Sequence, residues 1–204
     1  MKSYPCRLKN IILFCMMAAI LSGCAFNSQP PQYHTLSSIQ RSEKQLSTRN
    51  GFTVMIGPVM LPEKLKRPQI VVRTGDTGIR MLEFDKWAGS LRDDTRRVMV
   101  ENLGTLLGDA GGIVITDDAP VEPDYRIWVS VNRFEGILND SVQLDAVWTL
   151  KDQKKQSVIG INPFFIQQKI TGDGVSGLVE AHSRAIESLC RVMADAIVNL
   201  RRFS

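Results

Sequence analysis

The sequence has little of the two residue types that most metal and catalytic sites use. Its 204 residues include two histidines and four cysteines. Three of the cysteines fall within the first 24 residues, and Cys190 is the fourth. No group of Cys and His residues has the spacing of a zinc site. His182 and Cys190 both lie on or beside the apolar stripe of a C-terminal helical pattern, so we expect core residues, with no metal, no cofactor and no catalytic residue.

The glycine-rich segment Gly172–Gly177 does not change this expectation. It reads G-x-G-x-x-G and lies between a predicted strand and a predicted helix, as a dinucleotide-binding motif does. That helix is the last predicted element, so no second parallel strand follows to complete a nucleotide site. Gly174-Val175-Ser176 also begins like a nucleophile elbow, but Leu178 stands where that motif requires glycine. We therefore interpret the segment as a turn between a strand and a helix.

The N-terminal region lacks acidic residues up to Glu43. Three basic residues precede an uninterrupted apolar run at 11–21, which is about half as long as a membrane-spanning helix. This order is typical of a secretory signal, and the Leu-Ser-Gly-Cys sequence at 21–24 resembles the bacterial lipobox. We predict a lipoprotein signal peptide over 1–23 and a lipid anchor, palmitate included, on Cys24. An ordinary signal peptide followed by a chance cysteine is the alternative.

Removal of this signal peptide changes the charge and the cysteine content. It takes away Lys2, Arg7 and Lys9 and no acidic residue, so 22 basic residues remain against 21 acidic ones. The net charge falls from +4 to about +1, which removes the argument for a nucleic-acid partner. With Cys24 acylated, Cys190 has no partner for an internal disulfide, and the anchor holds the protein on a membrane.

Two regions are predicted after the signal peptide. Residues 24–50, rich in Gln, Ser, Pro and Asn, predict a flexible tether beginning at the acylated Cys24, in which Tyr33–Leu36 forms a short strand that clips the tether to the domain. Residues 51–204 predict one domain, because turn signals separate alternating apolar runs and two amphipathic patterns. Strands are expected at 52–56, 69–73, 78–84, 112–116, 125–134, 142–150 and 157–170, and helices between Asp85 and Gly111 and at 178–202.

This order of elements predicts an α+β fold. We expect a single two-layer domain, a mainly antiparallel (mixed) sheet with two long helices packed on one face. The charged residues at 92–97 of the first helix are expected to form its solvated face.

Nine segments form a further pattern along the chain. They are Leu21–Cys24, Tyr33–Leu36, Ile56–Arg73, Trp87–Leu91, Glu101–Leu103, Asp124–Arg126, Arg133–Glu135, Trp148 and Ala181–Ser183. Their order and spacing resemble the PqiC (YmbA) family of ABC-type transport auxiliary lipoproteins over nearly the whole chain. Three positions depart from the family pattern: His34 replaces the usual aromatic residue, and Lys64 and Lys66 replace Tyr and Asp.

The resemblance implies an outer-membrane lipoprotein that faces the periplasm and catalyses no reaction. It also implies partners, namely a membrane-spanning MCE-domain protein and an inner-membrane transporter component, which together move lipids between membranes and preserve envelope integrity. Ala25 after the anchor, rather than Asp, agrees with outer-membrane sorting. Two other classes stay open: a tethered interaction lipoprotein of another envelope machine, such as a cell-wall synthase activator, and a periplasmic hydrolase. A homo-oligomer is open as well.

The segment 61–69, Leu-Pro-Glu-Lys-Leu-Lys-Arg-Pro-Gln, is the candidate docking site. Its two prolines disfavour a helix, so the segment is either a stiff loop that feeds the next strand or a docking edge. In the second interpretation, the loop holds Leu65 and Arg67 outward at low entropic cost, toward a neighbouring copy or the MCE-domain partner. The candidate partner-binding residues are Leu61, Pro62, Leu65, Arg67, Pro68 and Gln69.

The first testable prediction concerns the anchor. Because acylation requires the thiol, Cys24→Ser should leave an uncut or soluble form of the protein. Cells grown with labelled palmitate should incorporate the label into the wild-type chain and not into Cys24→Ser. Label that persists in the variant would contradict the lipoprotein assignment.

Overall fold

The computed structural model describes residues 29–40 and 51–202. The predicted signal peptide, Cys24 and part of the predicted tether lie outside these ranges. The chain divides into two compact units, Met1–Pro30 and Pro31–Ser204, and the second carries every helix and strand described below. Within the described ranges, no helix has the length and apolar content that crossing a membrane requires.

Three long strands form the centre of this unit. β6 (Tyr125–Ile137), β7 (Ser141–Asp152) and β8 (Ser157–Lys169) follow one another as an antiparallel meander. The alternation of buried and less buried residues explains the pairing. Val129 and Trp148 lie opposite each other and both are buried, while the adjacent residues along each strand face the other side of the sheet. The predicted antiparallel meander is confirmed.

The first part of β6 also pairs with a parallel group of strands. β2 (Phe52–Met60) runs parallel to β6, with Val54 opposite Tyr125, and β5 (Gly112–Thr116) runs parallel to β2. The register of β2 shifts between Ile56 and Val59, at a Gly-Pro pair. The sheet is therefore mixed, as expected.

The far part of β6 pairs with a different group. β3 (Gln69–Arg73) contacts it through Val72 opposite Gly136, and β4 (Ile79–Trp87) pairs with β3 as an antiparallel hairpin. β1 (Gln32–His34) runs parallel to the end of β4, so the predicted clip strand exists, but it covers 32–34 and not 33–36. β6 thus lies at a fork, with β2 on one branch and β3 on the other.

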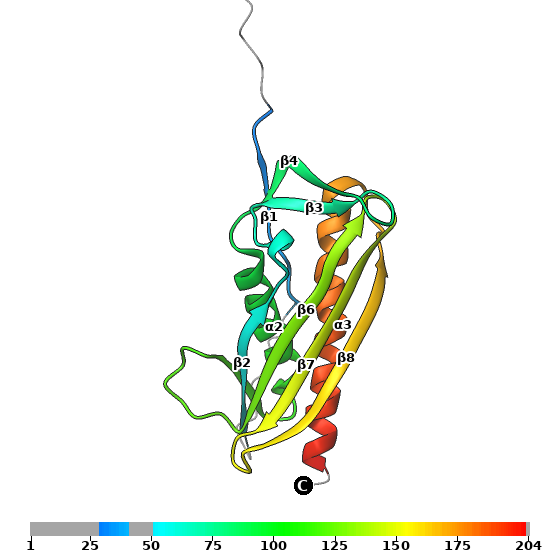
Figure 1. Cartoon of the computed structure of the whole chain (residues 1–204). Helices are drawn as coiled ribbons and strands as arrows, with labels where there is room; N and C mark the ends of the chain where they lie inside the picture. The colour runs from blue at the N-terminus through cyan, green and yellow to red at the C-terminus, as the bar shows by residue number, and fades with distance from the viewer. Residues whose placement is uncertain (1–28, 41–50, 203–204) are drawn as a thin grey trace, which may run out of the picture. The chain divides into compact units, whose positions relative to one another are not determined.

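Two helices cover one face of the sheet (Figure 1). They are α2 (Leu91–Gly108) and α3 (Gly174–Arg202), and they pack against each other and against the sheet. The stripe of α3 that includes Leu178 and Leu189 is fully buried, and so is Trp148 on the facing strand. The predicted fold, a single α+β domain with two long helices on one face, is confirmed.

The start of the first helix was predicted wrongly. The helical pattern after Asp85 includes Trp87, but β4 continues through Trp87, whose N–H donates to the Pro68 carbonyl at 2.7 Å. The helix begins at Leu91, because the Ser90 side chain accepts a hydrogen bond from the Asp93 N–H and caps it. A buried tryptophan suits a helix stripe and a strand face equally, and tertiary pairing with Pro68 favours the strand.

The glycines of Gly172–Gly177 serve the turn into α3. Gly174 has a φ of +58°, a conformation that favours glycine. A Cβ on Gly177 would lie 2.4 Å from the backbone carbonyl group of Gly172, so the two backbones pack directly against each other. The interpretation of the motif as a turn therefore has a steric explanation.

The second prediction follows from this contact. Gly177→Ala should destabilise the domain by about 1–3 kcal/mol, because its methyl group meets backbone that cannot move away cheaply. Gly104→Ala is the matched control, since Gly104 lies in α2 with nothing within 4 Å of its Cβ position. The control should be neutral or gain up to about 1 kcal/mol of stability. Urea unfolding of both variants measures the difference, and equal midpoints would contradict the packing argument.

Candidate functional site

The predicted docking loop, residues 61–69, bridges the two branches of the sheet. Pro62 and Pro68 flank a single 3₁₀ turn, η2 (Glu63–Leu65), which the Leu65 N–H closes by donating to the Pro62 carbonyl at 2.9 Å. This turn directs Leu65 into the core, where it is 3% exposed. The prediction that Leu65 points outward is wrong, and the segment is not wholly free of helical turns. Leu61 is also buried.

An ion cluster ties the loop to β6. The Lys64 ammonium lies 2.6 Å from Oε1 of Glu135, which is completely buried, and the Arg73 guanidinium lies 3.5 Å from the same oxygen. A buried carboxylate is costly unless cations compensate it, so these three side chains hold the loop against the sheet. Lys64, which departs from the family pattern, therefore compensates the charge of Glu135 in this structure.

The outer part of the loop forms one wall of a cavity of about 430 Å³. The opposite wall is the start of α2, and the lining residues are Leu65, Lys66, Arg67, Pro68, Gly89, Ser90, Leu91 and Arg92. Three of the predicted site residues, Leu65, Arg67 and Pro68, therefore meet at one cavity, whereas Leu61, Pro62 and Gln69 do not line it. Sequence reasoning missed the contribution of Gly89–Arg92, because only the fold brings this segment to the loop.

The three cations at this cavity have different neighbours. Lys66 pairs with the exposed Glu63, and Arg92 pairs with Asp93. Nη1 of Arg67 lies 2.9 Å from the sulfur of Met81, and within the described part of the chain no carboxylate forms an ion pair with its guanidinium. Exposed ion pairs of this kind are weak, so the cavity presents basic side chains that an incoming acidic group can reach.

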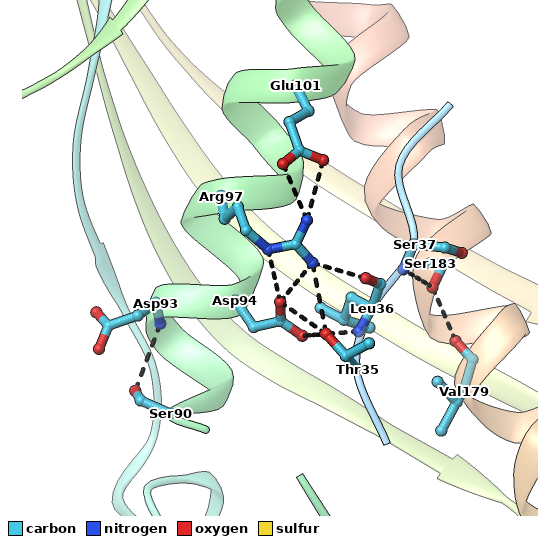
Figure 2. A network of polar contacts seen from close by, with 10 residues as sticks. All are labelled: Thr35, Leu36, Ser37, Ser90, Asp93, Asp94, Arg97, Glu101, Val179 and Ser183. Atoms are coloured by element: carbon cyan, nitrogen blue, oxygen red, sulfur yellow. Dashed lines mark hydrogen bonds and ion pairs between the residues drawn. The ribbon is translucent and has the colours of Figure 1, made fainter. Parts of the chain in front are cut away.

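A second set of contacts fixes the first described segment of this unit, residues 31–40, which we call the N-terminal strap. The Asp94 carboxylate accepts hydrogen bonds from the Leu36 N–H at 2.7 Å and from the Thr35 hydroxyl at 3.0 Å. The Arg97 guanidinium donates to the Leu36 carbonyl at 2.7 Å and is itself held by Asp94 and Glu101 (Figure 2). One acid and one base of α2 thus bind both backbone groups of Leu36.

Further contacts extend this attachment along the strap. The Ser37 N–H donates to the Ser183 hydroxyl on α3, and the Ile39 N–H donates to Oδ1 of the buried Asn102 at 2.7 Å. Leu36 itself is 1% exposed. The expectation that the charged residues at 92–97 form only a solvated face is therefore wrong for Asp94 and Arg97, because they bind the strap.

His182 and Cys190 are core residues, as predicted. The ring of His182 packs edge-on against Phe134 and Trp87, and its Nδ1–H donates to the Leu178 carbonyl. Burial lowers the pKa of His182 from 6.5 to about 4, and burial raises the pKa of the Cys190 thiol to about 12. Among residues 29–40 and 51–202, no group of three His, Cys, Asp or Glu side chains is arranged to hold a metal ion.

The third prediction concerns His182 and pH. Its pKa is lower in the folded than in the unfolded chain, so between pH 6.5 and pH 4 the unfolded state binds a proton that the folded state excludes. The contribution of neutral His182 to the free energy of unfolding is fully present above pH 6.5. It falls by on the order of 3 kcal/mol as the pH drops to about 4.

Urea unfolding of the wild type and His182→Gln over this range tests the prediction. Carboxylates titrate in both proteins, so the difference between the two profiles isolates His182. We expect the variant to be less stable at pH 7.5 and to lose less stability on acidification. Parallel profiles would contradict the assignment.

Comparisons with known proteins agree with this arrangement. Residues 34–194 match the family model described as the ABC-type transport auxiliary lipoprotein component. The chain is 24% identical over 168 residues to the intermembrane transport lipoprotein PqiC of Escherichia coli K12, covering 82% of this chain and 87% of that protein. PqiC of Shigella flexneri matches to the same extent.

Two crystal structures share the fold. An uncharacterized protein matches with a TM-score of 0.69 and 22% identity, over 83% of this chain and 99% of its own. A protein from Xanthomonas campestris matches with a TM-score of 0.64 and 12% identity, over 80% and 92% of the two chains. The family match extends from His34 in the strap to Ala194 in α3, and so includes the loop, the fork, α2 and most of α3. The chain belongs to the ABC-type transport auxiliary lipoprotein family.

Proposed function

We propose that this protein is the auxiliary lipoprotein of an MCE-type intermembrane lipid transport system. The observation that carries the proposal is the family match over 34–194. This match covers the docking loop and most of the strap. The PqiC relatives, whose name describes intermembrane transport, and the lipobox at 21–24 support it. In this proposal, the acylated Cys24 holds the domain on the outer membrane, facing the periplasm, and Ala25 in place of Asp agrees with this sorting.

The domain acts by docking to a partner and not by chemistry. Two side chains of types that serve acid–base or nucleophilic catalysis, His182 and Cys190, are sealed in the core, with pKa values that oppose both roles near neutral pH. The outer part of the loop is instead positioned at low entropic cost, because the Lys64–Glu135 ion pair and buried Leu65 fix its backbone.

The proposed occupant of the loop cavity is an acidic, partly apolar segment of the membrane-spanning MCE-domain protein. Lys66, Arg67 and Arg92 supply the positive charge around the cavity, and Pro68 supplies an exposed apolar edge. Charge of one sign at such an edge selects partners of the opposite sign and accelerates their association. A neighbouring copy of this chain is the alternative occupant that the experiment distinguishes.

The fourth prediction tests this cavity. Because Leu65 is buried, its substitution would report on folding, so the test reverses the outward charges instead. Lys66→Glu with Arg67→Glu, and separately Arg92→Glu, should reduce co-purification of the MCE-domain partner from envelopes at least tenfold. Circular dichroism and the melting temperature should stay close to wild type. Lys155→Glu, on the exposed turn between β7 and β8, is the matched control and should bind as wild type does.

Each outcome has a defined meaning. Partner binding that survives in both cavity variants would place the docking surface elsewhere. Variants that keep the partner but lose self-association, measured by light scattering, would assign the cavity to a contact between copies.

A further inference from the structure

The N-terminal strap limits how far the domain can move from its anchor, and this inference rests on the lipid anchor proposed above. The predicted tether extends from Cys24 to residue 50, but β1 and the bonds to Asp94, Arg97 and Asn102 attach the chain to the domain from residue 32 onward. Only seven residue steps separate Cys24 from Pro31. A fully extended chain of that length spans about 25 Å, which is less than the thickness of a bilayer.

The end of the domain that this short link holds near the membrane consists of β1, β4 and β3 (Figure 1). Large apolar side chains are exposed at this end. Tyr33 of β1 is 64% exposed, and Phe84 of β4 is 38% exposed. Ile79 and Met81, in the part of β4 that pairs with β3, are each 42% exposed.

The chemistry of these side chains matches the headgroup layer of a phospholipid bilayer. Tyrosine is enriched at membrane interfaces, since its ring is apolar and its hydroxyl stays hydrated. Lys86 lies opposite Tyr33 on the β1–β4 ladder, and Arg80 is exposed on β4, where each can reach lipid phosphates. Glu83 is exposed among them, so charge adds little and the apolar side chains carry most of the attraction.

We propose that the β1–β4 end of the domain rests on the lipid surface that holds the anchor, with Tyr33 and Phe84 in the headgroup layer. Exposed apolar residues also occur far from this end. Val158, for example, is 57% exposed near the start of β8. The turn between β7 and β8 lies at the opposite end of the domain (Figure 1). The lipid contact therefore orients the domain in addition to retaining it.

This orientation has a consequence for the docking loop. The Pro68 carbonyl accepts a hydrogen bond from the Trp87 N–H, and Gln69 pairs with Lys86 on β4. The loop cavity is thus attached directly to the strand that contacts lipid. Contact with the bilayer therefore holds the cavity at a fixed height above the membrane.

The fifth prediction uses the acylated full-length protein in vesicles of phosphatidylethanolamine and phosphatidylglycerol. Tyr33→Cys, Phe84→Cys and the control Val158→Cys are labelled with an environment-sensitive nitrobenzoxadiazole maleimide, since buried Cys190 is unreactive. Emission is recorded with and without spin-labelled lipids that quench in the headgroup layer. We expect a blue shift and at least twofold quenching at positions 33 and 84, and neither at position 158.

Flotation of the same samples separates the two proposals. Protein that floats with the vesicles while positions 33 and 84 behave like position 158 would overturn the lipid contact and leave the anchor intact. Protein that does not float would overturn the anchor and the inference that depends on it. Quenching at all three positions would replace the oriented contact by nonspecific adsorption.

Discussion

The attachment of the strap to α2 is the constraint on which the rest of this arrangement depends. Asp94 and Arg97 stand one turn apart on α2 and bind the N–H and the carbonyl of the same residue, Leu36. Hydrogen bonds to charged groups are about twice as strong as neutral ones, and here they accompany burial of the Leu36 side chain between the helices. Through them a segment with the composition of a tether becomes part of the domain, and β1 is held in register beside β4.

The fork in the sheet depends on the loop that connects its two branches, and this loop is held by a compensated buried charge. β6 is too long for either neighbour alone, so β2 and β3 share it, and the loop between them must cover the junction. The loop does so with a buried leucine and a lysine that neutralises Glu135, which leaves its basic outer edge free to bind. In the proposed function, stability and docking therefore fall to different side chains of one short segment, and the strap fixes the end of the sheet where this segment lies.

Regular patterns in the sequence were enough to predict the meander and the long helices, because an alternating or helical apolar pattern has one favourable way to face a core. The exceptions have physical reasons. Leu65 was placed outward because two prolines argue against a helix but do not exclude one 3₁₀ turn. Asp94 and Arg97 have the spacing of an ordinary helix ion pair. Nothing local in the sequence indicates that both also bind the backbone of Leu36, which precedes Asp94 by 58 residues. The cavity at Gly89–Arg92 likewise depends on tertiary contacts alone.

Hydrogen exchange of the strap amides is the most direct test of whether Asp94 and Arg97 hold the strap on the domain. Asp94→Ala removes the acceptor of the Leu36 N–H, while Asp93→Ala removes the neighbouring exposed carboxylate and serves as its control. We expect Asp94→Ala to accelerate exchange of the Ile39 amide about 10- to 100-fold, although the partner of that amide, Asn102, is unchanged. Core amides of β7 should exchange as in the wild type. Full protection of Ile39 in Asp94→Ala would contradict the claim that this pair holds the strap on the domain.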